Sequence, residues 1–240
     1  MTYRRDSDIF LPNENAFTRI IPNKTTMDDI WREEDIRKII GKKTKIALQV
    51  VSNCYTLSAS RSSAVSSIVL SREEYITELA KELNITRYGD CTSQKLCPGQ
   101  PCLYEKLEDH FFYIAFENSI CRHYVTEKFW NLKRIIVPVV LSRMPFQGLD
   151  IPEDSYIAAE DFETPKALAN YLLYLRNNLE EYMRYFSWIK RYRKGQGNNP
   201  LCQLCKWAVK KRKKTIKNVD EWWYPEDICA NYFALSLLPK

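Results

Sequence analysis

The sequence predicts an α/β fold in which a parallel sheet is covered by helices on both faces and is followed by a helical C-terminal extension. Two observations support this prediction. Short apolar runs rich in β-branched and aromatic residues alternate with segments of helical periodicity between residues 46 and 141. These runs are apolar nearly throughout, whereas a strand with one face in water would alternate apolar and polar residues. We therefore expect a Rossmann-like sheet whose strands are buried on both sides.

Four short segments are expected to form the strands. They are Ile46–Val51, Ile85–Tyr88, Phe111–Phe116 and Val137–Leu141. A polar loop rich in serine follows the first run, and a loop that contains cysteines and extends to about Cys102 follows the second. The longest apolar stretch of the chain, Ile135–Leu141, is far too short to cross a membrane and indicates a buried strand.

Start and stop signals mark the expected helices. Asp28–Ile40 is expected to be helical and to end at Gly41. A second helix is expected from Ser71, because Glu74 lies three residues later in the spacing of a capping box. The other predicted starts are Thr164 before Pro165, and Asn178 with Glu181 three residues on.

Cysteine content and glycosylation patterns bear on the compartment. The chain has eight cysteines, which is an even number compatible with disulfides in an oxidising compartment. Asn23-Lys24-Thr25 and Asn84-Ile85-Thr86 are acceptor patterns for N-glycosylation. The first residues contain no apolar segment of a signal peptide. We therefore expect a fragment, or an N-terminally shortened form, of a protein of the secretory pathway.

The residues that follow the predicted strands are the first candidates for a site, because ligands of parallel sheets bind at the carboxyl ends of the strands. Asn53 and Arg61 follow the first strand, and Glu117 and Asn118 follow the third. The segment Phe116–Trp130 carries a dense set of polar groups and leads into a predicted helix. We expect the start of this helix to form one wall of a ligand site.

The start of this helix has the chemistry of a diphosphate site. Thr126 is in position to cap the helix, whose free N–H groups favour an anion. Lys128 adds a positive charge, Glu127 offers acceptor oxygens to sugar hydroxyls, and Asn118 both donates and accepts. Tyr124 adds a ring with a hydroxyl. An amphipathic helix with ordinary surface charges is the alternative, and composition alone does not separate the two.

These residues resemble a known signature. Phe116-Glu117-Asn118-Ser119, then Tyr124-Val125-Thr126-Glu127-Lys128, then Val137-Pro138-Val139-Val140, is similar to the donor-site pattern of the α1,3-fucosyltransferases. Further segments between residues 1 and about 229 resemble the family in the same order: Tyr3–Ile9, Val50–Cys54, Asp161–Tyr171, Tyr185–Trp188 and Cys202–Cys205. The spacing at Trp130–Lys133 is most similar to nematode-type members.

The resemblance implies an inverting transfer of L-fucose from GDP-β-L-fucose to an N-acetylglucosamine unit of a glycan, in the Golgi. It implies that this chain is the C-terminal, donor-binding half of a GT-B glycosyltransferase. The donor contacts that it implies are Arg61, Asn118, Tyr124, Glu127 and Lys128. Arg61 would neutralise phosphate charge. Glu117 and Thr126 are expected to position the contact residues without touching the donor themselves.

The resemblance also implies a region upstream. In the family, the acceptor-binding half and its catalytic base precede the segment that resembles Tyr3–Ile9, so we expect the base and a membrane anchor only in a full-length form. We expect residues 1–44 to be a remnant of the link to that half. Residues 45–193 are expected to form the GDP-fucose-binding domain, and residues 194–240 a basic, cysteine-containing extension. The resemblance therefore supports donor binding more than turnover.

Two other functional classes stay open. One is a GDP-sugar-binding module without catalysis. The other is a nucleic-acid-binding protein that uses the basic stretch Lys206–Lys217, although a solvated helix face is the expected role of that stretch and no nucleic-acid partner is expected. Steep salt dependence of RNA or DNA binding would select this second class.

Three smaller motifs have alternative interpretations. No cofactor is expected to be required, but Asp6-Ser7-Asp8 is the short pattern by which some glycosyltransferases hold Mn²⁺, with a polar turn as the alternative. Cys202 and Cys205 favour a disulfide role over half of a zinc site, or free thiols if their partners lie outside the chain. His123 is expected to be a loop residue rather than a general base.

Overall fold

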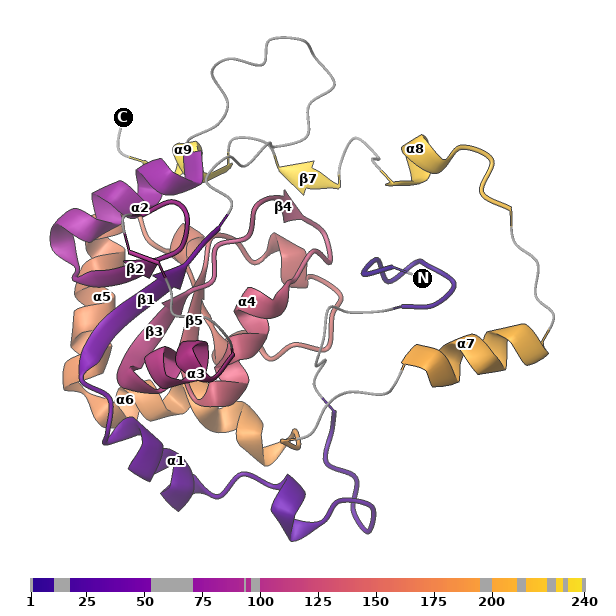
Figure 1. Ribbon diagram of the computed structural model, residues 1–240, viewed down its shortest axis with the longest axis horizontal. Helices are drawn as coiled ribbons and strands as arrows, with labels where there is room; N and C mark the ends of the chain where they lie inside the picture. Colours follow the sequence, from indigo (N-terminus) through magenta and orange to yellow (C-terminus); the bar gives the residue numbers. More distant parts are fainter. Residues whose placement is uncertain are drawn as a thin grey trace.

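The computed structural model of the chain describes residues 2–10, 18–52, 71–92, 94–95, 100–194, 200–210, 215–223, 228–230 and 233–238. Its centre is a five-stranded sheet in the order β2-β1-β3-β5-β6, and every neighbouring pair of strands is parallel (Figure 1). The strands are β1 (Lys45–Val50), β2 (Ile85–Tyr88), β3 (His110–Ile114), β5 (Val137–Val140) and β6 (Ile157–Ala158). The predicted parallel α/β sheet is confirmed.

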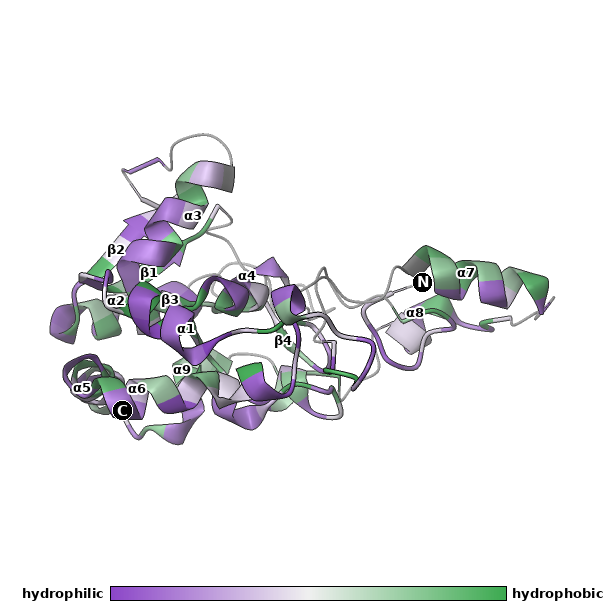
Figure 2. Ribbon diagram, turned by 90° about the horizontal axis from the view of Figure 1, so that it is seen from below, coloured by the Kyte–Doolittle hydropathy of each residue, from purple (hydrophilic) through white to green (hydrophobic). Residues whose placement is uncertain are grey.

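Helices cover both faces of the sheet. α2 (Ser71–Glu82) packs against α5 (Pro165–Asn177), which also touches β1, and α9 (Phe233–Ser236) packs against α2. α3 (Gln100–Asp109) contacts β1 and β3. Figure 2 shows α3 on one side of the sheet and α5 and α9 on the other. The remaining helices are α1 (Glu33–Ile40), α4 (Glu127–Trp130), α6 (Leu179–Met183), α7 (Pro200–Val209) and α8 (Val219–Trp223).

The central strands are apolar because both of their faces are covered. Every residue of β3 and of β5 is buried, and the polar His110 is no exception. The ring of His110 is satisfied inside the core, because Nδ1 lies 2.6 Å from the carbonyl oxygen of Lys106 and Nε2 lies 2.9 Å from the hydroxyl of Thr86. Tyr182 is also fully buried, and its hydroxyl donates to the Phe111 carbonyl at 2.6 Å. The polar groups of these two buried rings are thus paired, as burial requires.

Two elements differ from the predicted order. α3 begins at Gln100, inside the region expected to be a loop up to Cys102, and Leu107 at its end is fully buried. β6 has only two residues, which are too few to show a periodic pattern in the sequence. Both elements complete the sheet or its cover, so contacts with the rest of the chain decide their conformation.

The predicted helix Asp28–Ile40 is wrong in its first half. Met27–Asp29 forms a separate 3₁₀ turn, closed by hydrogen bonds between Thr26 and Asp29. Ile30 is then extended (φ −101°, ψ 137°), so that α1 begins only at Glu33. The local capping of the short turn therefore interrupts the apolar pattern that the sequence shows.

The two later helix starts illustrate how capping depends on context. Thr164 begins α5 as predicted, and its hydroxyl accepts from the Ala167 N–H at 3.1 Å. Asn178 precedes α6 as predicted, but its side chain donates to the Tyr174 carbonyl at 2.7 Å and does not cap α6. Asn178 is both the last flanking residue of α5 and the residue before α6, and its side-chain amide bonds to α5.

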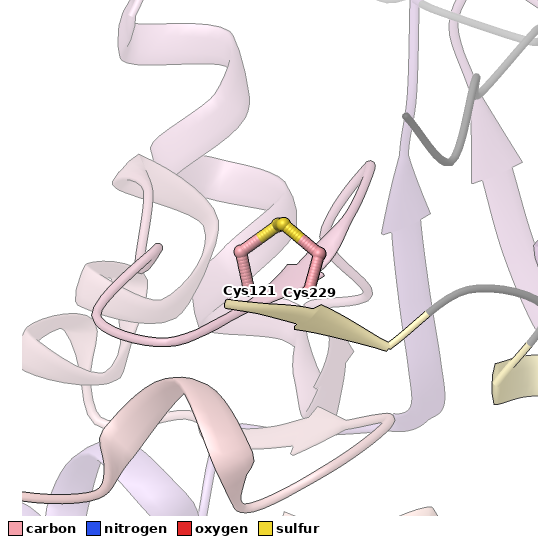
Figure 3. Close-up of a disulfide and its surroundings, with 2 residues drawn as sticks. All are labelled: Cys121 and Cys229. Atoms are coloured by element: carbon pink, nitrogen blue, oxygen red, sulfur yellow. A yellow bond between two sulfur atoms is a disulfide. The ribbon is translucent and has the colours of Figure 1, made fainter. Parts of the chain in front are cut away.

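The C-terminal extension contains helices, as predicted, and its last part returns to the domain. α7 is exposed along nearly its whole length, and Figure 2 shows it apart from the sheet and its covering helices. β7 (Cys229–Ala230) pairs with β4 (Ile120–Cys121), and a disulfide joins Cys121 to Cys229 (Figure 3). Ala234 of α9 is buried. The end of the chain therefore braces the segment that leads into α4.

The other described cysteines fall into two groups. Cys91 and Cys102 are disulfide-bonded, whereas Cys202 and Cys205 are exposed free thiols. Of the outcomes expected for Cys202 and Cys205, the structure shows the free thiols. No three His, Cys, Asp or Glu side chains gather as a metal site within the described ranges. In the same ranges, each helix is too short or too polar to cross a membrane.

Candidate functional site

The order of the strands places a crevice beside β1 and β3. β2 lies on one side of β1, and the other three strands lie on the opposite side, so the connections that leave β1 and β3 turn in opposite directions. Ligands of open parallel sheets bind at such a switch point, outside the carboxyl ends of the strands. The described residues at this edge come from the end of β3, the start of α2 and the start of α4.

Glu117 holds the start of α4 in place. Thr126 is the residue that caps α4, and its hydroxyl accepts from the Lys128 N–H at 3.4 Å. Glu117 in turn accepts from the N–H of Thr126 at 2.7 Å and from its hydroxyl, also at 2.7 Å. The predicted cap at Thr126 is confirmed. Through Glu117, the cap also ties α4 to the end of β3.

Positive charge at this point is concentrated on Lys128. Its Nζ lies 3.7 Å from the carboxylate of Glu117 and 3.5 Å from that of Glu127, and its side chain is 15% exposed. α4 has only four residues before it continues as the 3₁₀ turn Asn131–Arg134, so the charge that attracts an anion comes mainly from the side chain. Glu127 is open to solvent, with 72% of its side chain exposed.

Burial controls the ionisation of Glu117. Only 6% of the residue is exposed, and this desolvation raises the pKa of its carboxyl above the ordinary value. The ammonium of Lys128 and the hydrogen bonds from Thr126 oppose that shift. A carboxylate in this position is costly unless it is paired, so Glu117 and Lys128 depend on each other.

A second cation, Arg72, lies at the same edge and was not among the residues predicted from the sequence. It is the second residue of α2 and is 3% exposed, and its Nη1 donates to Oδ1 of Asn118 at 2.7 Å. Glu73 orients it by accepting from Arg72 Nε at 3.1 Å, and Glu73 also pairs with Arg87 of β2. The start of a helix favours negative charge, so an arginine in the first turn of α2 is unusual. This unusual position is the feature of the sequence that could have identified Arg72 as a candidate.

Tyr124 belongs to an aromatic cluster that joins the N-terminal segment to α8. Its ring centroid lies 5.3 Å from that of Tyr3, which lies 5.6 Å from Trp223 of α8. The guanidinium of Arg4 lies 4.5 Å from the ring of Trp222. These contacts bring the segment 2–10 and α8 against the loop before α4. Trp222 and Trp223 thus act as anchors of the extension.

Three other candidates have different positions. His123 lies in a loop with φ 67°, and its Nδ1 accepts from the Arg5 N–H at 3.3 Å. Asp6 is paired with Arg4 at 2.6 Å. Asn53 and Arg61 lie outside the described residues, so their predicted place beside the first strand remains a prediction.

Comparison with known proteins agrees with these features. Residues 40–222 match the sequence model of glycosyltransferase family 10 (fucosyltransferase), C-terminal part. Over 99% of its length, the chain is 34% identical to α-(1,3)-fucosyltransferase fut-5 of Caenorhabditis elegans, of which the match spans 62%. It is 35% identical to fut-1 of the same organism, over 77% of the chain and 43% of that protein.

Solved structures show the same fold. A crystal structure of α1,3-fucosyltransferase with GDP-fucose superposes with a TM-score of 0.53 at 18% identity. The match covers 76% of this chain and 51% of the solved chain. The chain thus spans roughly half of the solved enzyme, and 62% and 43% of these two relatives. It belongs to glycosyltransferase family 10, the fucosyltransferases, and corresponds to the C-terminal part of that family.

Proposed function

We propose that the chain binds GDP-fucose at the edge beside β1 and β3 and supplies the donor side of α1,3-fucosyl transfer to an N-acetylglucosamine unit of a glycan. The observation that carries this proposal is the pair of cations, Lys128 and Arg72, each held at this edge by a carboxylate. A nucleoside diphosphate carries several negative charges, and hydrogen bonds between oppositely charged groups are the strong ones. The names of the relatives support fucosyl transfer as the chemistry.

Each side chain of the site has a role that suits its chemistry. Lys128 contacts the diphosphate as a compact charge. Arg72, whose planar fork is engaged by Glu73 and Asn118, adds positive charge to the site and orients Asn118. Asn118 has its carbonyl oxygen engaged by Arg72, so its amide N–H groups remain to face the donor. Glu127 is exposed and accepts from sugar hydroxyls. Tyr124 offers a ring and a hydroxyl beside them.

In this proposal the donor is held without a metal ion. Arg4 engages both carboxylate oxygens of Asp6, at 2.9 and 2.6 Å, so the Asp6-Ser7-Asp8 pattern is a poor fit for Mn²⁺. Lys128, Arg72 and the predicted contact Arg61 supply the positive charge instead. GDP-fucose affinity should therefore be the same with and without a chelator.

Transfer of fucose also needs a base within hydrogen-bond reach of the acceptor hydroxyl. Glu117 is occupied by Thr126 and Lys128. Asp161 is occupied by Arg143, which donates to its two oxygens at 3.1 and 2.6 Å. Since both carboxylates are engaged, we expect this chain alone to bind GDP-fucose and to transfer no fucose above background.

We place this function in the lumen of the Golgi. The disulfide between Cys121 and Cys229 suits an oxidising compartment. The bonded state of Cys91 and Cys102 points the same way. Fractionation of native cells tests this placement. Recovery of the protein outside the secretory pathway would contradict it.

Calorimetry with GDP tests the site. Lys128→Ala removes a charge-assisted contact and should cost about 1.5–3 kcal/mol, or roughly 10- to 150-fold in Kd. Lys81→Ala is the matched control, because Lys81 also pairs with a carboxylate, Glu78 at 2.7 Å, but on an exposed face of α2. Unchanged affinity in Lys128→Ala would remove Lys128 from the site.

A second assay separates a donor half from a non-catalytic GDP-sugar-binding module. The acceptor-binding part of a relative is joined to this chain, and labelled fucose on a glycan acceptor is measured. Restored transfer supports the enzyme, whereas GDP-fucose binding without any transfer supports the module. Transfer by the unmodified chain at the rate of a full-length relative would show that Glu117 or Asp161 serves as the base after all.

A further inference from the structure

The acceptor pattern Asn23-Lys24-Thr25 lies in a well-defined turn. The Lys24 N–H donates to the Ile21 carbonyl at 3.1 Å and closes a β-turn with Pro22 and Asn23 at its centre. Asn23 has φ 64°, and asparagine is one of the few residues that tolerate a positive φ after a proline in such a turn. The Thr25 hydroxyl lies 3.1 Å from both the N and the O of Ile21. The sequence thus sets Asn23 at the tip of the turn, where the residue is exposed.

Both arms of this turn are anchored to the domain. On one arm, the Ile20 N–H donates to the Arg191 carbonyl at 2.9 Å. On the other, the Lys194 N–H donates to the Asp29 carbonyl at 2.7 Å. In Figure 1 the purple segment ahead of α1 lies beyond the end of the sheet where β1 begins, whereas the candidate site lies where the strands finish. The segment that carries this turn therefore lies away from the candidate site.

The second acceptor pattern, at Asn84, is placed differently. Its Thr86 belongs to β2 and pairs in register with Leu48 of β1. The hydroxyl of Thr86 lies 2.9 Å from Nε2 of the buried His110. Folding thus engages the hydroxyl of the second pattern in the sheet, whereas Thr25 of the first stays in a surface turn.

We propose that Asn23 is a site of N-linked glycosylation. In the reaction, Nδ2 of Asn23 forms a bond to C1 of an oligosaccharide carried on a lipid diphosphate, the bond from C1 to the diphosphate oxygen breaks, and the amide loses one proton to solvent. The lipid diphosphate leaves. Such a glycan belongs on a surface turn of a secretory protein. The inference rests on the secretory compartment proposed above and not on donor binding.

Glycopeptide mass spectrometry tests the inference. The full chain is secreted from mammalian cells behind a cleavable leader, and the peptide that contains residue 23 is examined. We expect a glycan on Asn23 in most molecules, its complete loss in Asn23→Gln and in Thr25→Ala, and its retention in Thr25→Ser and in the control Asn84→Gln. An unmodified Asn23 in secreted protein that contains the Cys121–Cys229 disulfide overturns the inference.

GDP titration of the same preparations keeps the inference apart from the proposed function. Asn23→Gln should bind GDP with unchanged Kd, because the turn is remote from Lys128 and Arg72. A glycan on Asn23 together with absent GDP binding supports the inference and contradicts the proposed function. A bare Asn23 with normal GDP binding overturns the inference alone.

Discussion

Thr126→Val is the change that best tests how the start of α4 is built. Valine keeps the shape of threonine but removes the hydroxyl, which accepts from the Lys128 N–H and donates to the buried Glu117. The N–H of residue 126 remains, so Glu117 keeps one donor at 2.7 Å and the ammonium of Lys128 at 3.7 Å. The variant should therefore fold, with a destabilised and less ordered helix start.

The magnitude follows from the two roles of the hydroxyl. Loss of a cap costs about 0.5–2 kcal/mol. Loss of a hydrogen bond to a charged, buried acceptor costs about 1.5–3 kcal/mol. Because one hydroxyl serves both roles, the costs overlap, and we expect the free energy of unfolding to fall by roughly 2–4 kcal/mol. GDP affinity should fall as well, since Lys128 loses its fixed position.

Urea denaturation and GDP titration measure these effects, and Thr164→Val is the matched control. Thr164 also caps a helix, with the Ala167 N–H at 3.1 Å, but within the described part of the chain no hydrogen bond joins it to a buried carboxylate. The control should lose only the cap, about 0.5–2 kcal/mol, and should keep its GDP affinity. Equal losses of stability in both variants, together with unchanged GDP affinity in Thr126→Val, would refute the role assigned to Glu117.

Three further predictions concern pH, the disulfide and the second cation. Burial lowers the pKa of His110 and of His123 below 6.5, so the unfolded state binds more protons than the folded state as the pH falls below 6.5. The free energy of unfolding should therefore drop in this range, and urea denaturation from about pH 7.5 to 5 measures the drop. The variant His110→Gln should show a smaller drop. Cys229→Ser opens a link between residues 108 apart and should cost about 2–5 kcal/mol, and an unchanged melting temperature would contradict this. Arg72→Lys keeps the charge but loses the planar fork, so GDP should bind about 10-fold or more weakly, and unchanged binding would exclude Arg72 from the site.

Much of the fold was predictable because its signals are local. The run at Val137 is apolar at every position and the run at Ile46 is apolar except at Gln49, and such runs are typical of strands buried in a parallel sheet. Thr164 followed by Pro165 begins a helix because the cap and the fixed φ of proline act within one turn. The prediction of a helix at Asp28–Ile40 was wrong because of another local signal. The cap at Thr26 places Met27–Asp29 in a separate 3₁₀ turn.

The candidate site was predictable only in part. Glu117, Thr126 and Lys128 stand within twelve residues of one another, so a single motif shows them together, and their hydrogen bonds follow from that spacing. Arg72 meets Asn118 across 46 residues, and no pattern within one segment contains both. Arg72 is at the edge because the sheet order puts the start of α2 beside the end of β3.

The sequence by itself determined the class of fold, the segments that become strands, the cap at Thr126 and the family, since each depends on residues close together in the chain. The tertiary structure alone decided that Arg72 joins Asn118, that the end of the chain is bonded to Cys121, and that Tyr3 and Trp223 pack beside Tyr124. These contacts close loops of many residues, and their entropic cost is offset only when the whole sheet and its helices assemble. A local sequence pattern therefore does not indicate which distant residue will be in contact in the folded protein.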